Sequence, residues 1–76
     1  MKTLAQAKYD FSIGYLTTFK IERGLMGEGW LLHLGEGNSA GFLVDARTKK
    51  ARIFKSVDSV ISTLESIGFE ILLLRR

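Results

Sequence analysis

Short apolar stretches alternate with glycine-rich or charged breaks along most of the chain, a pattern typical of a small antiparallel sheet. The predicted strands are residues 15–22, 30–34, 41–46, 51–54 and 69–74. In the first strand the more apolar side carries Tyr15, Phe19 and Ile21, and the other side is wetter. We therefore expect a sheet with one buried face.

A polar turn over residues 47–50 is predicted to join the third and fourth strands. If the turn spans these four residues, Val44 lies opposite Ile53 and Asp45 lies opposite Arg52. This register pairs apolar side chains with each other and opposite charges with each other, which favours it.

The clearest local signal predicts a helix over residues 57–67. Ser56 is a good N-cap, Asp58 favours the positive end of the helix dipole, and Gly68 can end the helix in a left-handed conformation. The apolar stripe consists of Val57, Val60, Ile61, Leu64 and Ile67. The predicted fold is thus α+β, in the order β-β-β-β-α-β, with four to five antiparallel strands and one amphipathic helix packed on the sheet.

The length of 76 residues indicates a single domain with a thin core. Residues 1–13 carry weak signals and are predicted to be either a short helix or a flexible lead-in. The last strand, 69–74, is apolar on both sides, and Leu25 and Met26 are apolar residues in a loop. Because such surfaces need cover, a homodimer is expected.

The residues that could carry catalysis are few. The chain has no cysteine and one histidine, His33, which the alternation places on the less apolar side of its strand. We interpret His33 as a solvent-side histidine rather than a catalytic or metal-binding one. The glycine-rich breaks match no phosphate-binding loop and are read as turns. We therefore expect a protein that is not an enzyme and has no cofactor, metal or small-molecule substrate.

Positive charge is concentrated around the predicted turn. Of the eleven Lys and Arg residues, the cluster contains Arg47, Lys49, Lys50, Arg52 and Lys55. These cations could contact phosphates of nucleic acid, giving salt-sensitive affinity, and Phe42 and Phe54 could stack on bases if exposed. The alternative is a turn that only keeps the protein soluble.

No stretch approaches the length of a membrane span, and the opening residues are too polar for a signal peptide. The expected location is cytoplasmic, with no membrane partner.

The segment from Gly41 through Asp58, continued at Leu64-Glu65 and 67–70, resembles small accessory proteins encoded on bacterial plasmids near partition or replication loci. The resemblance rests on the residues Val44 to Thr48, Ala51-Arg52, Phe54 to Ser56, Asp58, Leu64-Glu65 and Ile67 to Glu70. It implies a role in plasmid maintenance or its regulation and assigns no catalytic residue. The strand-to-helix part also resembles sheet-plus-helix DNA-binding modules, including the amino-terminal domains of some integrases. Two functions remain open at this point: a nucleic-acid-binding accessory protein, and a homodimeric protein-interaction module or adaptor that binds no nucleic acid.

Overall fold

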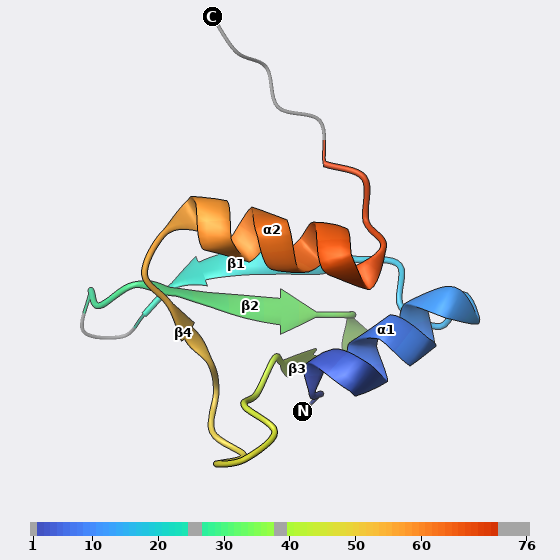
Figure 1. Ribbon diagram of the computed structural model, residues 1–76, viewed down its shortest axis with the longest axis horizontal. Helices are drawn as coiled ribbons and strands as arrows, with labels where there is room; N and C mark the ends of the chain where they lie inside the picture. The colour runs from blue at the N-terminus through green and yellow to red at the C-terminus, as the bar shows by residue number, and fades with distance from the viewer. Residues whose placement is uncertain (1, 25–26, 38–39, 72–76) are drawn as a thin grey trace, which may run out of the picture.

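The computed structural model describes residues 2–24, 27–37 and 40–71, which form an α+β fold (Figure 1). The elements in chain order are α1 (Leu4–Ser12), β1 (Phe19–Arg23), β2 (Trp30–Leu34), β3 (Gly41–Phe42), β4 (Ile53–Phe54) and α2 (Val57–Ile67). The four strands make one antiparallel sheet. The fold class predicted from the sequence is therefore confirmed, with a second helix added at the start of the chain.

Strand β2 is the centre of the sheet. Strand β1 pairs along its whole length, from Phe19 opposite Leu34 to Arg23 opposite Trp30. On the other side of β2, β3 pairs with the end of the strand and β4 pairs with its beginning. Strands β3 and β4 thus share one edge of β2, and β1 lies at the opposite edge of the sheet.

The predicted pairing between the third and fourth strands is wrong. Val44 lies opposite Ala51 in an isolated bridge, whereas the prediction placed it opposite Ile53. The turn closes one residue earlier than expected, because the N–H of Asp45 donates to the carbonyl of Lys50 at 2.9 Å. Strand β4 pairs with β2 instead, and this pairing carries its second residue into the core.

Helix α2 has the bounds that its capping residues predicted. The Ser56 hydroxyl accepts the N–H of Ser59 at 3.2 Å, which satisfies one of the unpaired donors of the first turn. Gly68 ends the helix with φ of 134°, and its N–H donates to the carbonyl of Leu64 at 3.1 Å. The helix packs over β2 and β4 and against α1. The side chains that it buries are Val60, Leu64 and Ile67.

The sequence allowed either a short helix or a flexible lead-in for residues 1–13, and the structure has a helix there, α1. Thr3 is its N-cap, and the Thr3 hydroxyl accepts the N–H of Gln6 at 3.3 Å. Ala7 is fully buried in the core, and the ring of Phe11 packs edge-on against Phe69 with 4.8 Å between centroids. The segment is therefore a helix docked on the core.

The first predicted strand begins later than expected. The N–H groups of Tyr15 and Leu16 both donate to the carbonyl of Asp10, at 2.8 and 3.0 Å, so these residues close the end of α1. Strand β1 starts only at Phe19. Leu16 is buried and Tyr15 is 62% exposed, the reverse of the predicted orientation.

The hydrophobic core lies between the two helices and one face of the sheet. Its buried members are Ala7, Leu16, Leu32, Leu34, Leu43, Phe54, Val60, Leu64 and Ile67. Residues 69–71 are not in a strand, contrary to the prediction, although Phe69 packs against Phe19 with 5.1 Å between ring centroids. The rest of the predicted last strand, 72–74, and the loop residues Leu25 and Met26 lie outside the described residues.

Candidate nucleic-acid interface

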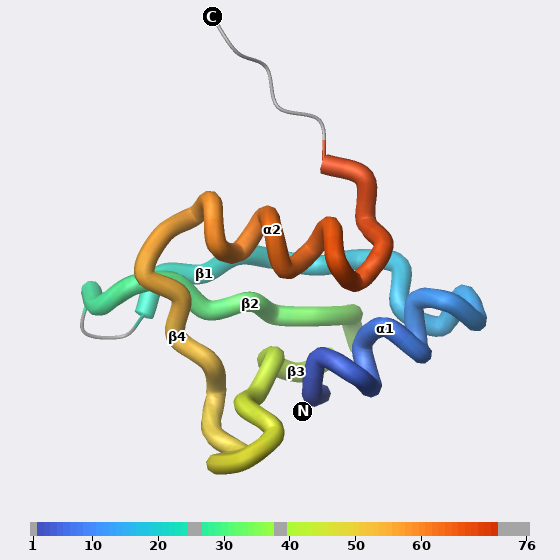
Figure 2. Tube along the Cα trace, viewed as in Figure 1, coloured from blue at the N-terminus to red at the C-terminus, as the bar shows by residue number. Residues whose placement is uncertain are grey.

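Four of the five clustered cations lie in the connection between β3 and β4. In this connection, residues 45–52 project away from the rest of the molecule as a loop (Figure 2). We refer to residues 45–52 as the basic loop. It contains Arg47, Lys49, Lys50 and Arg52.

Asp45 organises the turn of the basic loop. One oxygen of its carboxylate accepts the backbone N–H groups of Arg47 at 2.8 Å and Thr48 at 3.2 Å. These two hydrogen bonds hold the pKa of the Asp45 carboxyl below its ordinary value. The N–H of Lys49 donates to the Asp45 carbonyl at 2.8 Å, and Lys49 adopts a left-handed conformation with φ of 62°. The carboxylate is thus used to shape the loop.

The cationic side chains that the sequence predicted as a nucleic-acid site are all exposed. They are Arg47, Lys49, Lys50, Arg52 and Lys55. Within the described residues, the ion pairs are Lys2 with Asp10 and Lys20 with Glu22. None of the five cations therefore forms an ion pair with a described carboxylate, although the Asp45 carboxylate attracts Arg47 and Arg52 electrostatically.

The structure separates Lys55 from the other four cations. Lys55 follows β4, whereas the basic loop precedes it. Four of the cations therefore lie in the basic loop, and Lys55 lies in the short connection between β4 and α2.

Neither aromatic residue beside the cluster is fully exposed. Phe54 is 3% exposed and belongs to the core, so it does not meet the condition of exposure on which stacking was predicted. The guanidinium of Arg52 lies 4.8 Å from the centroid of the Phe54 ring, a cation–π contact that holds this arginine in place. Phe42 is half-buried and packs edge-on against His33, with 5.0 Å between ring centroids.

His33 lies on the side of β2 that faces away from the core, as predicted. It is half-buried and stands opposite Lys20 of β1, while its neighbours Leu32 and Leu34 point into the core. An open cavity of about 410 Å³ is lined by His33, Lys20 and Glu36, among others. This cavity lies at the start of β1 and the end of β2, apart from the basic loop.

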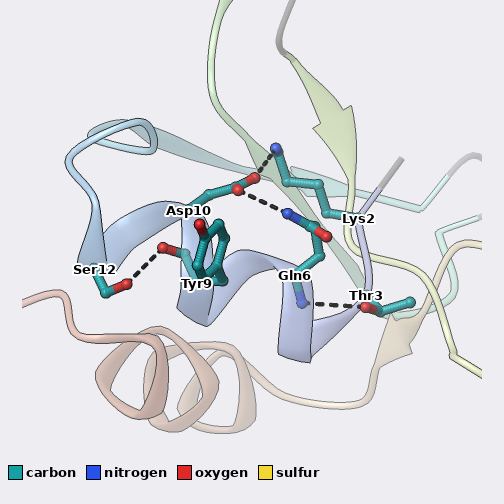
Figure 3. A network of polar contacts seen from close by, with 6 residues as sticks. All are labelled: Lys2, Thr3, Gln6, Tyr9, Asp10 and Ser12. Carbon is teal, nitrogen blue, oxygen red and sulfur yellow. Dashed lines mark hydrogen bonds and ion pairs between the residues drawn. The ribbon is translucent and has the colours of Figure 1, made fainter.

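A polar network around Asp10 was missed by the sequence reasoning (Figure 3). The buried Asp10 carboxylate forms an ion pair with Lys2 and accepts a hydrogen bond from the Gln6 amide at 2.8 Å. Lys2 is also bound to the sheet, because its N–H donates to the carbonyl of Phe42 and its carbonyl accepts the N–H of Val44. The network thus fastens α1 to the chain beside the basic loop.

Acid is expected to destabilise this attachment. The hydrogen bond and charge of Lys2 lower the pKa of Asp10 below its ordinary value of 3.8. A lowered folded-state pKa stabilises the fold fully above the unfolded value, and this stabilisation is lost as pH falls through the folded value, below about pH 4. We expect Asp10→Asn to melt at a lower temperature at pH 7 and to lose less further stability between pH 5 and pH 2. Thermal unfolding followed by circular dichroism tests this, and an acid profile parallel to that of the wild type would contradict it.

Comparison with known protein families, curated proteins and solved structures finds no match for the chain. Neither described helix is long and apolar enough to cross a membrane. In the same part of the chain, no three His, Asp or Glu side chains are grouped so that they could hold a metal ion.

Proposed function

We propose that this protein is a small non-enzymatic accessory protein of bacteria, plasmid-borne as its resemblance implies, and that it binds nucleic acid through the basic loop. The observation that carries this proposal is the group of four exposed cations on a projecting loop, without ion pairs to described carboxylates. Phosphate contacts by such side chains release counterions and do not depend on base sequence.

The shape of the loop supports contact with a phosphate backbone. Asp45 is the loop's carboxylate, and two backbone N–H groups already engage it. Lys49 and Lys50 follow each other in the turn, and the exposed Arg52 has its guanidinium over the Phe54 ring, 4.8 Å from the ring centroid. Three phosphate contacts would make the logarithm of the affinity fall with the logarithm of salt at a slope of about −2.7. Affinity would then drop about 40-fold between 50 and 200 mM salt.

Charge reversal in the loop tests the proposal. We expect Lys50→Glu to weaken binding of a fluorescent 20-base-pair DNA about tenfold at 50 mM salt and to lower the salt slope by about one. The double variant Lys49→Glu/Lys50→Glu should weaken it about a hundredfold. Fluorescence anisotropy titrations, repeated with single-stranded DNA and RNA, measure these effects.

The matched control is Lys8→Glu, which makes the same charge change on α1 at another exposed lysine. It should change affinity less than threefold. Equal losses for Lys8→Glu and Lys50→Glu would mean that only overall charge matters, and no measurable binding of any nucleic acid at low salt would end the proposal.

The second candidate function is a homodimeric protein-interaction module that binds no nucleic acid. The observation that favours it is the outer edge of β1, which no described element covers.

A further inference from the structure

Strand β1 presents an unpaired edge of backbone groups. The N–H of Gly35 donates to the carbonyl of Thr18, and the N–H of Gly24 donates to the carbonyl of Gly29, so both ends of the β1–β2 ladder are hydrogen-bonded pairs. Hydrogen-bonded pairs alternate along an antiparallel ladder. Lys20 and Glu22 therefore bond to β2, and the backbone groups between and beside them point outward.

The outward-pointing groups belong to Phe19, Ile21 and Arg23. In the described part of the chain, no hydrogen bond is made by their N–H or carbonyl groups. An edge of this kind can accept another extended strand, and proteins usually prevent this with proline, a bulge or repelling charges. The sequence contains no proline, and the described residues of β1 form a regular ladder without a bulge.

The side chains of β1 complement a second copy of the same strand. Two antiparallel copies centred on Ile21 would bond through the outward groups, with Ile21 opposite itself and Phe19 opposite Arg23. On the other face, Lys20 of each copy would stand opposite Glu22 of its partner, in the non-hydrogen-bonded pairs where side chains come closest. Charged side chains on an edge strand usually prevent pairing with another strand. In this arrangement they favour pairing, because each Lys20 stands opposite a Glu22 of the other copy.

We propose that two copies of this chain form a homodimer by antiparallel pairing of their β1 strands, which joins the two sheets into one. The charges needed are accessible, since the Lys20 side chain is 71% exposed, and its ammonium lies only 3.5 Å from the Glu22 carboxylate of the same strand. In the dimer each of these charges gains a second partner. Phe19 is 36% exposed and would stand opposite the second copy's Arg23, whose guanidinium lies 4.8 Å from the centroid of the Trp30 ring of its own chain.

The dimer leaves the basic loop accessible in both copies. The loop joins β3 and β4, which share the edge of β2 opposite to β1. Two loops on one rigid assembly would raise affinity for a polyanion through effective concentration. The interface itself does not depend on nucleic-acid binding, so either proposal can fail alone.

Complementary charge variants test the β1 interface. A five-residue strand pairing is smaller than a standard interface, so we expect wild-type protein to pass from monomer to dimer between about 10 µM and 1 mM. Lys20→Glu alone places four carboxylates across the two-fold axis, and Glu22→Lys alone places four ammonium groups there. Each variant should weaken dimerisation about tenfold or more, as measured by sedimentation velocity.

An equimolar mixture of these two variants should dimerise as well as the wild type, because each Glu of one chain then faces a Lys of the other. The exposed-lysine variant Lys8→Glu is the control and should dimerise normally, and circular dichroism verifies that every variant is folded. A wild-type protein that stays monomeric at 1 mM overturns the proposal. This is the result expected if residues 72–76 or another protein covered the β1 edge instead of a second copy. Variants that dimerise like the wild type, or a mixture that does not recover, place the interface elsewhere and also overturn it.

Discussion

Replacing Leu64 with alanine is expected to remove a large part of the stability of the domain. The side chain is fully buried on α2 and belongs to the cluster that also contains Leu32 and Phe54. Truncating a buried leucine costs about 2–5 kcal/mol, because the loss of apolar burial is added to the cost of a cavity. A domain of this size has roughly 4–11 kcal/mol in total at about 0.05–0.15 kcal/mol per residue. Urea unfolding followed by circular dichroism measures the loss.

The control for this variant is Glu65→Ala, at the next position on the same helix. Glu65 is exposed, so its replacement should change the free energy of unfolding by about 0.5 kcal/mol or less. A Leu64→Ala protein that unfolded at the same urea concentration as Glu65→Ala would show that α2 does not pack on the sheet as described.

The helix α2 could be predicted because all of its signals are local. Ser56 and Gly68 mark its ends, and the apolar stripe between them has the helical period. Helix α1 lacks a strong stripe, and its position depends on the ion pair between Lys2 and Asp10 and on the packing of Phe11 against Phe69. Those contacts join residues that are close only after folding, so the sequence left this segment undecided.

The strand register failed for a related reason. Cross-strand pairs of charges and apolar residues favoured Val44 opposite Ile53, a reading that treats the two strands as an isolated hairpin. In the fold, Asp45 closes the turn earlier through its own hydrogen bonds, and Ile53 and Phe54 find a better partner in β2. A pattern that considers only two strands cannot show that a third strand, here β2, competes for pairing with one of them.

The candidate site was predictable in its charges and not in its shape. Lysine and arginine side chains on a polar turn are expected to be exposed, and all five are. The burial of Phe54 follows from the β2–β4 pairing, which the sequence did not predict. The unpaired edge of β1 likewise depends on strand order, which is a property of the assembled sheet.

Gly29→Ala is expected to have the other large effect on stability, because Gly29 lies where β4 packs against the start of β2. Its φ of 76° disfavours any side chain, and a Cβ there would lie 2.4 Å from the Phe54 carbonyl oxygen and 2.8 Å from a methyl carbon of Ile53. The carbonyl belongs to the β2–β4 pairing and cannot withdraw without breaking it. We expect a loss of about 3 kcal/mol or more, of which the left-handed backbone accounts for about 1–2 kcal/mol.

Gly27→Ala separates these two causes. Gly27 has nearly the same φ, 73°, but a Cβ at that position would meet no atom of the described residues within 4 Å. Its replacement should therefore cost only the backbone part, about 1–2 kcal/mol, in the same urea experiment. The difference in lost unfolding free energy between the two variants measures how closely β4 approaches Gly29. Because β4 follows the basic loop directly, Gly29→Ala should also weaken nucleic-acid binding more than Gly27→Ala does. Equal losses of stability in the two variants would mean that β4 does not lie against Gly29.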